Sequence, residues 1–271
     1  MDKINVIKVG GAVVENEASL KELINQFATM PGYKVLVHGG GRSATRIAAQ
    51  LGIESRMVGG RRITDEDMLQ VVTMVYGGLV NKRIVAALQA SGVNALGLTG
   101  ADMDIFRTHW REPKMVTMDD GTQKMVDFGF VGDVDHANGQ RLASLVKAKD
   151  GIEAAVPVVA PLTHDGMGNI LNTNADTMAA TVAKALTEEF DVTLTYCFEK
   201  PGVMADAEDD DSVIPSINTE SYARLKADGI VSGGMIPKLD NAFDSISSGV
   251  KRVVITHFMD IQASMGTVIE K

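Results

Sequence analysis

The chain has 271 residues, of which 45% are hydrophobic, and its net charge is −9 because 35 acidic residues outnumber 26 basic ones. A chain of this length and apolar content can bury a substantial core as one large domain or two lobes. The negative charge and the lack of a basic stripe argue against nucleic acid or an anionic membrane as the main partner. The single cysteine, Cys197, excludes an intrachain disulfide.

The N-terminus and the apolar stretches predict neither export nor membrane insertion. Met1 is followed by charged Asp2 and Lys3 and then by a predicted strand, so we expect no secretory signal. We count no apolar stretch of the roughly 18 residues that a membrane span needs. The expectation is a cytoplasmic protein without a membrane partner.

The first ordered stretch is a short apolar run that ends in a lysine and two glycines. Residues 4–9 are rich in β-branched side chains, which predicts a buried strand, and Gly10 and Gly11 follow it. A glycine pair there lets the main chain turn sharply and leaves N–H groups unshielded, as phosphate binding requires. Lys8 adds a fixed positive charge, although a surface lysine beside an ordinary turn is the alternative.

Strand and helix patterns then alternate. Apolar residues at helical spacing fill residues 20–27, and a second strand at 34–38 runs into Gly39, Gly40 and Gly41 before another helix. This is a second strand, glycine loop and helix of the kind that binds phosphate. The βαβα order predicts an α/β protein whose parallel sheet is covered by helices.

The triple glycine also fits a loose dinucleotide-binding pattern through Gly39, Gly41 and Ala44. Such a site also needs an acidic residue about 20 positions on, at the end of the next strand, and none stands convincingly there. An NAD-dependent oxidoreductase therefore stays as a distant alternative. His38 closes its strand with no other metal-ligating residue at suitable spacing, so a structural, hydrogen-bonded role is favoured over chemistry.

A hairpin and a long helix follow. The hairpin is predicted between Glu54 and Ile63, folding back toward the glycine loops, where Arg62 could clamp a carboxylate. A surface arginine is the alternative. The helix from Asp65 to Ser91 is apolar over more than one face, which suggests a partner subunit, with a fully covered core helix as the other possibility.

The middle of the chain ends in a second group of polar residues at a helix start. A hairpin is predicted around Asp119-Asp120-Gly121, and a buried strand at 154–159. Further on, Asn172 and Asn174 offer amide donors where a helix begins, and Asp176 stands in its first turn. Capping explains Asn174 but leaves Asn172 and Asp176 in excess.

Six segments, taken in order, resemble the N-acetylglutamate kinases of the amino-acid kinase family, and the resemblance covers nearly the whole chain. The segments are Lys8-Val9-Gly10-Gly11, Val37-His38-Gly39-Gly40-Gly41, Gly60-Arg61-Arg62-Ile63-Thr64, Gly129-Phe130-Val131-Gly132, Asn172-Thr173-Asn174-Ala175-Asp176 and Gly234-Met235-Ile236-Pro237-Lys238. The resemblance implies an α/β fold, a three-layer αβα sandwich with a central, mostly parallel sheet. It also implies two lobes, with residues 1–187 binding the acyl amino acid and residues 188–271 binding the nucleotide.

The resemblance also implies a role for each matching residue. Lys8 and Lys238 would lie on the transferring phosphoryl group, held by Asp176 as the third catalytic residue. The other implied groups are phosphate-binding backbone at Gly10, Gly11, Gly40 and Gly41, substrate-binding Gly40, Gly41, Arg62, Asn172 and Asn174, and nucleotide-binding Lys8, Gly202, Val203, Met235 and Lys238. The expected cofactors are ATP and Mg²⁺, with no residue assigned as a metal ligand.

The implied function is ATP-dependent phosphorylation of the γ-carboxylate of N-acetyl-L-glutamate in arginine biosynthesis. A carboxylate nucleophile is already ionised at neutral pH, so the lack of a histidine or cysteine constellation agrees with this reaction. The same reaction on N-succinyl-L-glutamate remains open, because the sequence does not fix the acyl group. A catalytically silent amino-acid sensor is a further alternative, against which Lys8 and Lys238 both speak.

The sequence departs from the family pattern in the nucleotide lobe. Phe198-Glu199-Lys200 stands where relatives usually read Thr-Asp-x before Pro-Gly-Val, so the nucleotide contacts are the least defined. An acidic run, Glu208 to Asp211, is interpreted as a solvated loop rather than a magnesium site.

The last expectation concerns assembly. Family members inhibited by arginine carry an extra N-terminal helix that builds a hexameric ring, whereas here the first strand begins by Ile4. We expect a homodimer formed through the helix from Asp65 to Ser91, with activity indifferent to arginine.

Overall fold

The computed structural model describes the chain except residues 119–120, 148–152, 207, 234, 263–264 and 271, and the side chain of Pro237. The predicted turn at Asp119-Asp120 and Gly234 of the sixth segment therefore lie outside the described residues. In chain order the elements are β1 (Lys3–Val9), α1 (Gly11–Glu15), α2 (Glu17–Thr29), β2 (Tyr33–His38), α3 (Gly41–Gln50), β3 (Met57–Val58), β4 (Arg61–Arg62), α4 (Glu66–Val72), η1 (Thr73–Val80), α5 (Asn81–Ala90), β5 (Ala95–Leu98), η2 (Asp102–Asp104), β6 (Phe106–Trp110), β7 (Lys114–Thr117), β8 (Gln123–Val126), β9 (Gly132–Ala137), α6 (Gly139–Val146), β10 (Val156–Val159), β11 (Leu162–His164), β12 (Ile170–Asn172), α7 (Ala175–Ala185), β13 (Asp191–Phe198), β14 (Ser216–Ile217), α8 (Thr219–Ala227), α9 (Met235–Ser247), β15 (Arg252–His257) and β16 (Thr267–Ile269).

An eight-stranded sheet forms the centre of the molecule, in the order β14-β16-β15-β13-β1-β2-β10-β5. Its pairs are parallel except β15 with β16, which agrees with the predicted mostly parallel sheet. β1 lies in the middle, with Lys8 beside Val37 on β2 and beside Tyr196 on β13. The carboxyl ends of three parallel strands therefore meet at one edge of the sheet, where ligands of open α/β sheets bind.

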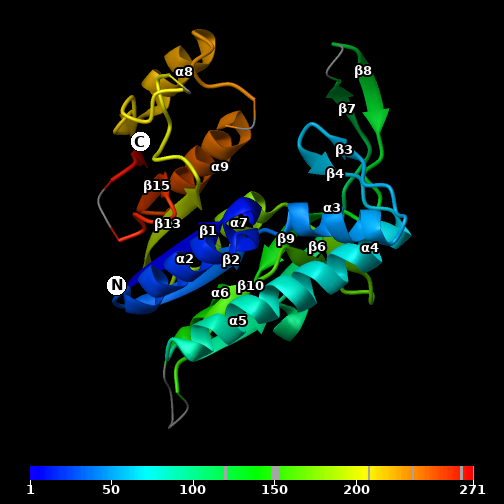
Figure 1. The fold of residues 1–271 in the computed structure, drawn as a ribbon, viewed down its shortest axis with the longest axis horizontal. Coiled ribbons are helices and arrows are strands. Elements are labelled where there is room, and N and C mark those ends of the chain that lie inside the picture. Colours follow the sequence, from blue (N-terminus) through cyan, green and yellow to red (C-terminus); the bar gives the residue numbers. More distant parts are fainter. Residues whose placement is uncertain (119–120, 148–152, 207, 234, 263–264, 271) are drawn as a thin grey trace.

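Helices cover both faces of this sheet, which confirms the three-layer αβα architecture (Figure 1). The alternation of side chains along β1 sends Ile4 and Val6 into one core layer, with α6, α7 and α9. Ile7 and Val9 enter the opposite layer, with α2, α3 and the helix of residues 66–90. Lys8 shares the face of Ile4 and Val6, so its side chain points toward α7.

Two hairpins extend from one side of the sheet. β3 pairs with β4 and β7 with β8, and a small apolar cluster packs Val58, Ile63 and Val116 against Val126, Phe128 and Val131. In Figure 1 these hairpins rise opposite α8, α9 and β15. The hairpin predicted between Glu54 and Ile63 is confirmed, and the two hairpins form one wall above the sheet edge.

The predicted long helix is continuous from Glu66 to Ala90, with a π-helical segment, η1, in its middle. With a mean hydropathy of 1.3 over an 18-residue window, it passes the length and composition test for a membrane span, so the sequence-based count of apolar stretches was wrong. That count looked for uninterrupted apolar residues, whereas a window tolerates the glycines and Asn81. Val72, Val75 and Ile84 of this helix are buried in the core between the helix and one face of the central sheet.

A buried polar link ties this helix to the second glycine loop. The Asn81 amide donates to Nε2 of His38 (3.1 Å) and to the carbonyl of Val158 (2.8 Å). Nδ1 of His38 therefore carries the proton and donates to the Gly39 carbonyl at 2.8 Å. His38 is fully buried and structural, as the sequence predicted, and the link holds Gly39 at the end of β2.

This link predicts a pH dependence of stability. Burial lowers the pKa of His38 from 6.5 to about 4, so between these pH values the unfolded chain binds a proton that the folded chain does not. The His38 contribution is therefore fully present above pH 6.5 and is lost as pH falls toward 4, by roughly 3 kcal/mol in total. Urea unfolding of wild type and His38→Gln between pH 7 and pH 4.5 measures it: the wild type should lose more stability.

The exposed His136 provides the matched control. His136→Gln should follow the wild-type profile. Parallel profiles for wild type and His38→Gln would contradict the buried-histidine assignment.

Candidate active site

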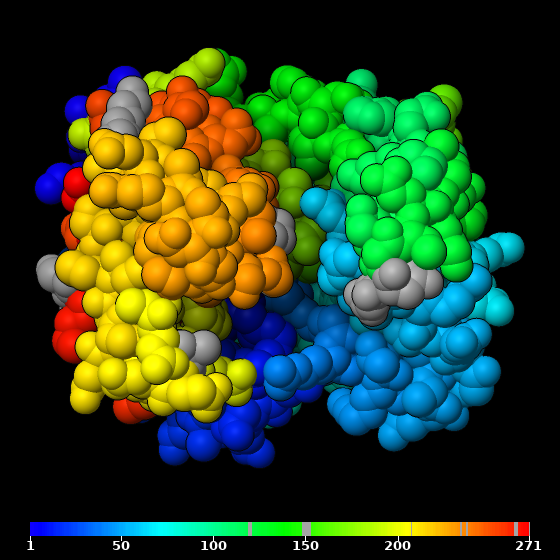
Figure 2. All heavy atoms as spheres, turned by 90° about the horizontal axis from the view of Figure 1, so that it is seen from above, coloured from blue at the N-terminus to red at the C-terminus, as the bar shows by residue number. Residues whose placement is uncertain are grey.

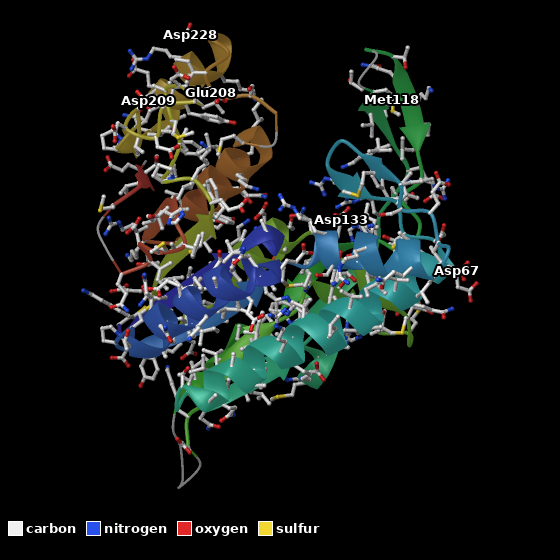
Figure 3. The ribbon with its side chains drawn as sticks, viewed as in Figure 1. Asp67, Met118, Asp133, Glu208, Asp209 and Asp228 are labelled. Carbon is white, nitrogen blue, oxygen red and sulfur yellow. The ribbon has the colours of Figure 1, made fainter. Side chains whose placement is uncertain are left out.

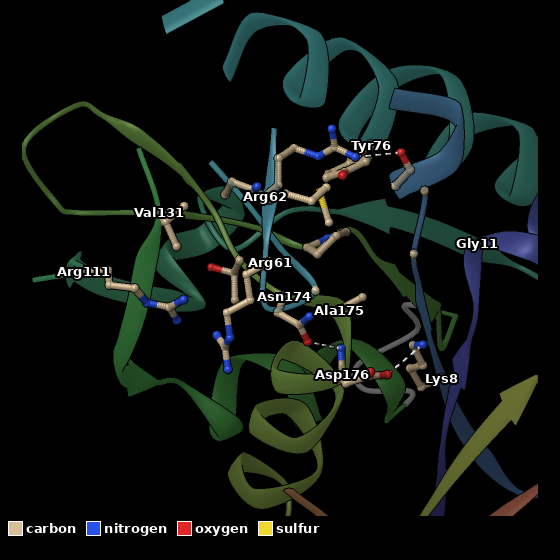
Figure 4. Close-up of a pocket in the computed structure, with 18 residues that line it drawn as sticks. Lys8, Gly11, Arg61, Arg62, Tyr76, Arg111, Val131, Asn174, Ala175 and Asp176 are labelled. Atoms are coloured by element: carbon tan, nitrogen blue, oxygen red, sulfur yellow. Dashed lines mark hydrogen bonds and ion pairs between the residues drawn. The ribbon is translucent and has the colours of Figure 1, made fainter. Parts of the chain in front are cut away.

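A cavity of about 210 Å³ opens at the carboxyl ends of β1 and β2. Figure 2 shows the molecule hollowed between the C-terminal elements, yellow to orange, and the hairpin side, light blue and green. The predicted site residues that line the cavity are Lys8, Gly11, Gly40, Gly41, Arg62, Asn172, Asn174 and Asp176. These residues come from four of the six segments, and Val131, which also lines the cavity, comes from a fifth (Figure 4).

Two lysines converge on one carboxylate. Lys8 Nζ lies 2.7 Å from Oδ1 of Asp176, and Lys238 Nζ lies 2.8 Å from Oδ2. Asp176 is in the first turn of α7, and Lys238 is in the first turn of α9, which packs beside α7. The Tyr196 hydroxyl donates to the Asp176 carbonyl at 3.3 Å, which fixes the start of α7 from the neighbouring strand.

The electrostatics of the triad keep the carboxylate ionised. Burial on its own would raise the pKa of Asp176, but the charges of Lys8 and Lys238 outweigh it and lower the pKa from 3.8 to about 2. One carboxylate balances two ammonium groups, so the triad carries a net positive charge at neutral pH. Such a site attracts an anion.

The two glycine loops approach each other closely beside this triad. A Cβ built on Gly39 would lie 3.2 Å from the Gly11 nitrogen, and one built on Gly11 would lie 3.6 Å from the nitrogens of Gly40 and Gly41. The gap between the loops is therefore lined by main chain. N–H groups in such a position can receive phosphate oxygens directly.

The amide and guanidinium groups are held by their neighbours. Arg62 donates through Nη2 to the Gly41 carbonyl (2.8 Å) and to the Thr45 hydroxyl (2.9 Å), which orients its guanidinium beside the second loop. Asn172 donates to the Thr64 hydroxyl at 3.0 Å. Asn174 caps α7, and its Oδ1 accepts from the backbone N–H of Asp176 and of Thr177. Among the described residues, its amide nitrogen makes no hydrogen bond.

Other predicted residues do not line this cavity. The N–H of Gly10 donates to the Cys197 carbonyl. Gly202 and Val203 are buried in the turn after β13, where the Val203 N–H donates to the Thr267 hydroxyl at 2.8 Å. Met235 begins α9 and is half-buried.

Several side chains of the cavity wall were missed by sequence reasoning, among them Tyr76, Arg61 and Arg111. Tyr76 comes from η1 and lies against Gly40, while Arg61 and Arg111 come from the hairpin side (Figure 4). Tyr76 was read as part of an apolar helix, and nothing in the local sequence shows that η1 turns it toward the loop. Arg61 stood in a quoted segment, next to the residue that was chosen.

The acidic run from Glu208 to Asp211 is exposed, in agreement with the predicted solvated loop. Glu208 and Asp209 are exposed, and Figure 3 shows them on the outer side of the C-terminal half. Asp210 pairs with Lys200 at 3.0 Å. Among the described residues, no group of three or more His, Cys, Asp or Glu side chains could hold a metal ion.

The arrangement defines an enzyme that transfers a phosphoryl group: a mostly parallel sheet presents two main-chain loops and Lys8 to one cavity, and Lys238 pairs with Asp176 of the cavity wall. The chain belongs to the amino acid kinase family, because the family model of that description matches residues 3–257. Acetylglutamate kinase of Bacteroides thetaiotaomicron is 59% identical over 270 residues, which is 100% of this chain and 99% of the relative. Acetylglutamate kinase of Methanopyrus kandleri is 39% identical over 266 residues, covering 98% of this chain and all of the relative.

Solved structures with lower identity share the fold. Carbamate kinase from Giardia superposes with a TM-score of 0.65 at 16% identity, covering 100% of this chain and 99% of the other. N-acetylglutamate synthase from Neisseria gonorrhoeae superposes with a TM-score of 0.77 at 21% identity, covering 99% of this chain and 59% of the other.

The close packing of the second loop against η1 yields a prediction. A Cβ on Gly40 would lie 2.9 Å from the Tyr76 ring, so Gly40→Ala must displace the loop or the ring. Because small displacements of positioning groups are costly in catalysis, kcat/KM should fall by about a hundredfold in a steady-state kinase assay.

Gly78→Ala is the control, because nothing described lies within 4 Å of its added Cβ. It should retain nearly all of the activity. Full activity in Gly40→Ala would show that the loop does not bind the reacting group.

Proposed function

We propose that this chain is an acetylglutamate kinase, which phosphorylates the γ-carboxylate of N-acetyl-L-glutamate with ATP. The carboxylate oxygen attacks the γ-phosphorus of ATP, the bond from that phosphorus to the β-phosphate oxygen breaks, and ADP leaves. The product is an acyl phosphate. The comparisons favour acetyl over the succinyl alternative, because the close relatives over the full chain are acetylglutamate kinases.

The observation that carries this proposal is the triad of Lys8, Asp176 and Lys238 beside two main-chain loops. The nucleophile and the phosphoryl group are both anionic, so the site must overcome their repulsion, and the two ammonium groups do so. Asp176 holds both lysines in position without joining the reaction. Since the nucleophile is already ionised, no general base is needed.

The rest of the cavity would hold the amino acid. Arg62, oriented by Gly41 and Thr45, would bring a guanidinium charge to the α-carboxylate. Asn172 and Asn174 would donate amide hydrogens to the substrate, in keeping with their place in the cavity wall. These contacts would bind the ground state and the transition state equally, since they do not change as the phosphoryl group moves.

The nucleotide belongs to the C-terminal part in this proposal. Residues 1–187 supply the cavity wall for the acceptor. Residues 188–271 form the ATP lobe with Gly202, Val203 and Met235, and add Lys238 beside Asp176. Mg²⁺ would arrive on the phosphates of ATP, which is how it is commonly held in phosphoryl-transfer enzymes, and would neutralise their charge.

An ATP-coupled hydroxamate assay with N-acetylglutamate tests the function. Hydroxylamine traps the acyl phosphate, so colour should appear only when ATP, Mg²⁺ and N-acetylglutamate are all present. No product, with the protein folded, would refute the proposal.

The two kinds of charged residue should differ in kinetic effect. Lys8→Ala or Lys238→Ala should lower kcat by roughly a hundredfold or more while changing KM for N-acetylglutamate little, because the charge acts on the transition state. Arg62→Ala should mainly raise KM. Steady-state kinetics with each substrate varied measures both, and an unchanged kcat in Lys238→Ala would remove that lysine from the mechanism.

The setting of the reaction is also part of the proposal. Phosphorylation of N-acetylglutamate belongs to arginine biosynthesis, and a step that consumes ATP fits the cytoplasm. We further propose a homodimer. On the helix of residues 66–90, Met74 and Leu79 are 54% and 52% exposed, and a second copy would cover them.

The dimer proposal predicts a mass of two chains in light scattering. Leu79→Glu would put a charge into the contact and should give the mass of one chain. Leu51→Glu, which changes an equally exposed leucine on a different element, should leave the mass unchanged. A single-chain mass for the wild type would exclude the homodimer.

A further inference from the structure

The wall of the cavity contains a tyrosine hydroxyl to which the proposed reaction gives no role. Tyr76, on η1, is only 5% exposed, and its ring lies against Gly40. A Cβ built on Gly41 would lie 4.0 Å from the Tyr76 hydroxyl oxygen and 3.7 Å from Nη2 of Arg62. The hydroxyl and the guanidinium therefore meet on the same side of Gly41, and Figure 4 shows the two side chains next to each other.

Arg62 uses most of its own hydrogen-bond donors on the protein. Its Nη2 donates to the Gly41 carbonyl at 2.8 Å and to the Thr45 hydroxyl at 2.9 Å. Its Nη1 donates to the Ser55 hydroxyl and to the sulfur of Met68, the latter at 3.8 Å. Both terminal nitrogens of the guanidinium thus have protein partners. Arg62 brings a positive charge to the cavity, but few free N–H groups.

The Tyr76 hydroxyl, by contrast, has a proton to donate. Burial raises the pKa of Tyr76 by more than the charge of Arg62 and a hydrogen bond from it lower that pKa, so the hydroxyl is protonated at neutral pH. Because a guanidinium has donors only, its contact uses a lone pair of the hydroxyl oxygen. In the described part of the chain, the hydroxyl donates no hydrogen bond of its own.

We propose that Tyr76 is a further substrate-binding residue, whose hydroxyl donates a hydrogen bond to the α-carboxylate that Arg62 attracts. The inference rests on the proposed function, in which this carboxylate faces Arg62. The two residues act differently: the guanidinium supplies charge, whereas the hydroxyl supplies a directed hydrogen bond to one oxygen. An O–H group that donates to a carboxylate makes a short, charge-assisted bond, and this bond fixes the carboxylate relative to Gly41.

A packing role is the other explanation of Tyr76, because its ring covers Gly40. Tyr76→Phe separates the two roles, since phenylalanine keeps the ring and removes only the hydroxyl. The matching change in the ligand is 4-acetamidobutanoate, which is N-acetylglutamate without the α-carboxylate. A hydrogen bond between the hydroxyl and the α-carboxylate exists only when both groups are present.

The test measures KM for N-acetyl-L-glutamate and the inhibition constant of 4-acetamidobutanoate as its competitor. Tyr76→Phe should raise KM for N-acetylglutamate about tenfold, as the loss of a hydrogen bond to a charged group implies, and should change kcat by less than about threefold. The inhibition constant of 4-acetamidobutanoate should change by less than about twofold, because this ligand has no group for the hydroxyl to bind. Equal weakening of both ligands, or of neither, would overturn the inference.

Two controls accompany this variant. Thermal unfolding of Tyr76→Phe should match that of the wild type, which shows that the ring still packs against Gly40. Tyr33→Phe removes a hydroxyl from a ring that packs against Phe190, outside the cavity wall, and it should leave both constants unchanged.

Turnover of N-acetylglutamate by the wild type tests the proposed function separately. If the wild type forms product and Tyr76→Phe has an unchanged KM, the function stands and the hydroxyl does not bind the substrate. If the wild type forms no product, the function is refuted. Calorimetry with the same two ligands then measures the hydroxyl alone, because binding does not require phosphoryl transfer. Equal calorimetric affinity of wild type and Tyr76→Phe for N-acetylglutamate would refute the role of the hydroxyl as well.

Discussion

The arrangement of the site depends on the contact of Asp176 with two lysines from opposite ends of the chain. Lys8 comes from the first strand and Lys238 from the last long helix, and each reaches one oxygen of the same carboxylate. A buried carboxylate between two ammonium groups is stable because it is paired twice, whereas removing Asp176 would leave two ammonium groups close together without their counter-charge. The same contact connects β1, α7 and α9, so the position of the charges follows from the packing of the core.

The glycine loops depend on a second constraint, the close approach of main chain to main chain. Gly11 and Gly39 leave room for each other because neither has a Cβ, and Tyr76 closes the space over Gly40. The buried side chains of His38 and Asn81 stabilise this region through hydrogen bonds to each other and to the carbonyls of Gly39 and Val158. Phosphoryl transfer requires mainly that the protein hold the reacting groups rigidly in position, since the reaction needs little covalent catalysis.

The local sequence predicted much of the fold and of the candidate site, but it did not predict some particular residues and one helical segment. The strand and glycine patterns predicted the sheet, the loops and Lys8. They could do so because the alternation of apolar residues along a strand determines which face of the sheet each residue lies on. Asp176 could be singled out because a cap alone did not explain it. Arg61 and Arg111 of the cavity wall could not, since they are distant in sequence and no periodic pattern relates them. The π-helical segment was missed for a similar reason, because packing rather than residue type turns Tyr76 toward the loop.

The separate apolar cluster under the hairpins has an evolutionary consequence. Val58, Ile63 and Val116 pack with Val126, Phe128 and Val131 apart from the two main core layers. Hairpin residues can therefore be exchanged at little cost to β1 and α7, which carry Lys8 and Asp176. Gene duplication followed by drift in these two hairpins would diversify the ligands of the fold while its phosphoryl-transfer chemistry stayed constant.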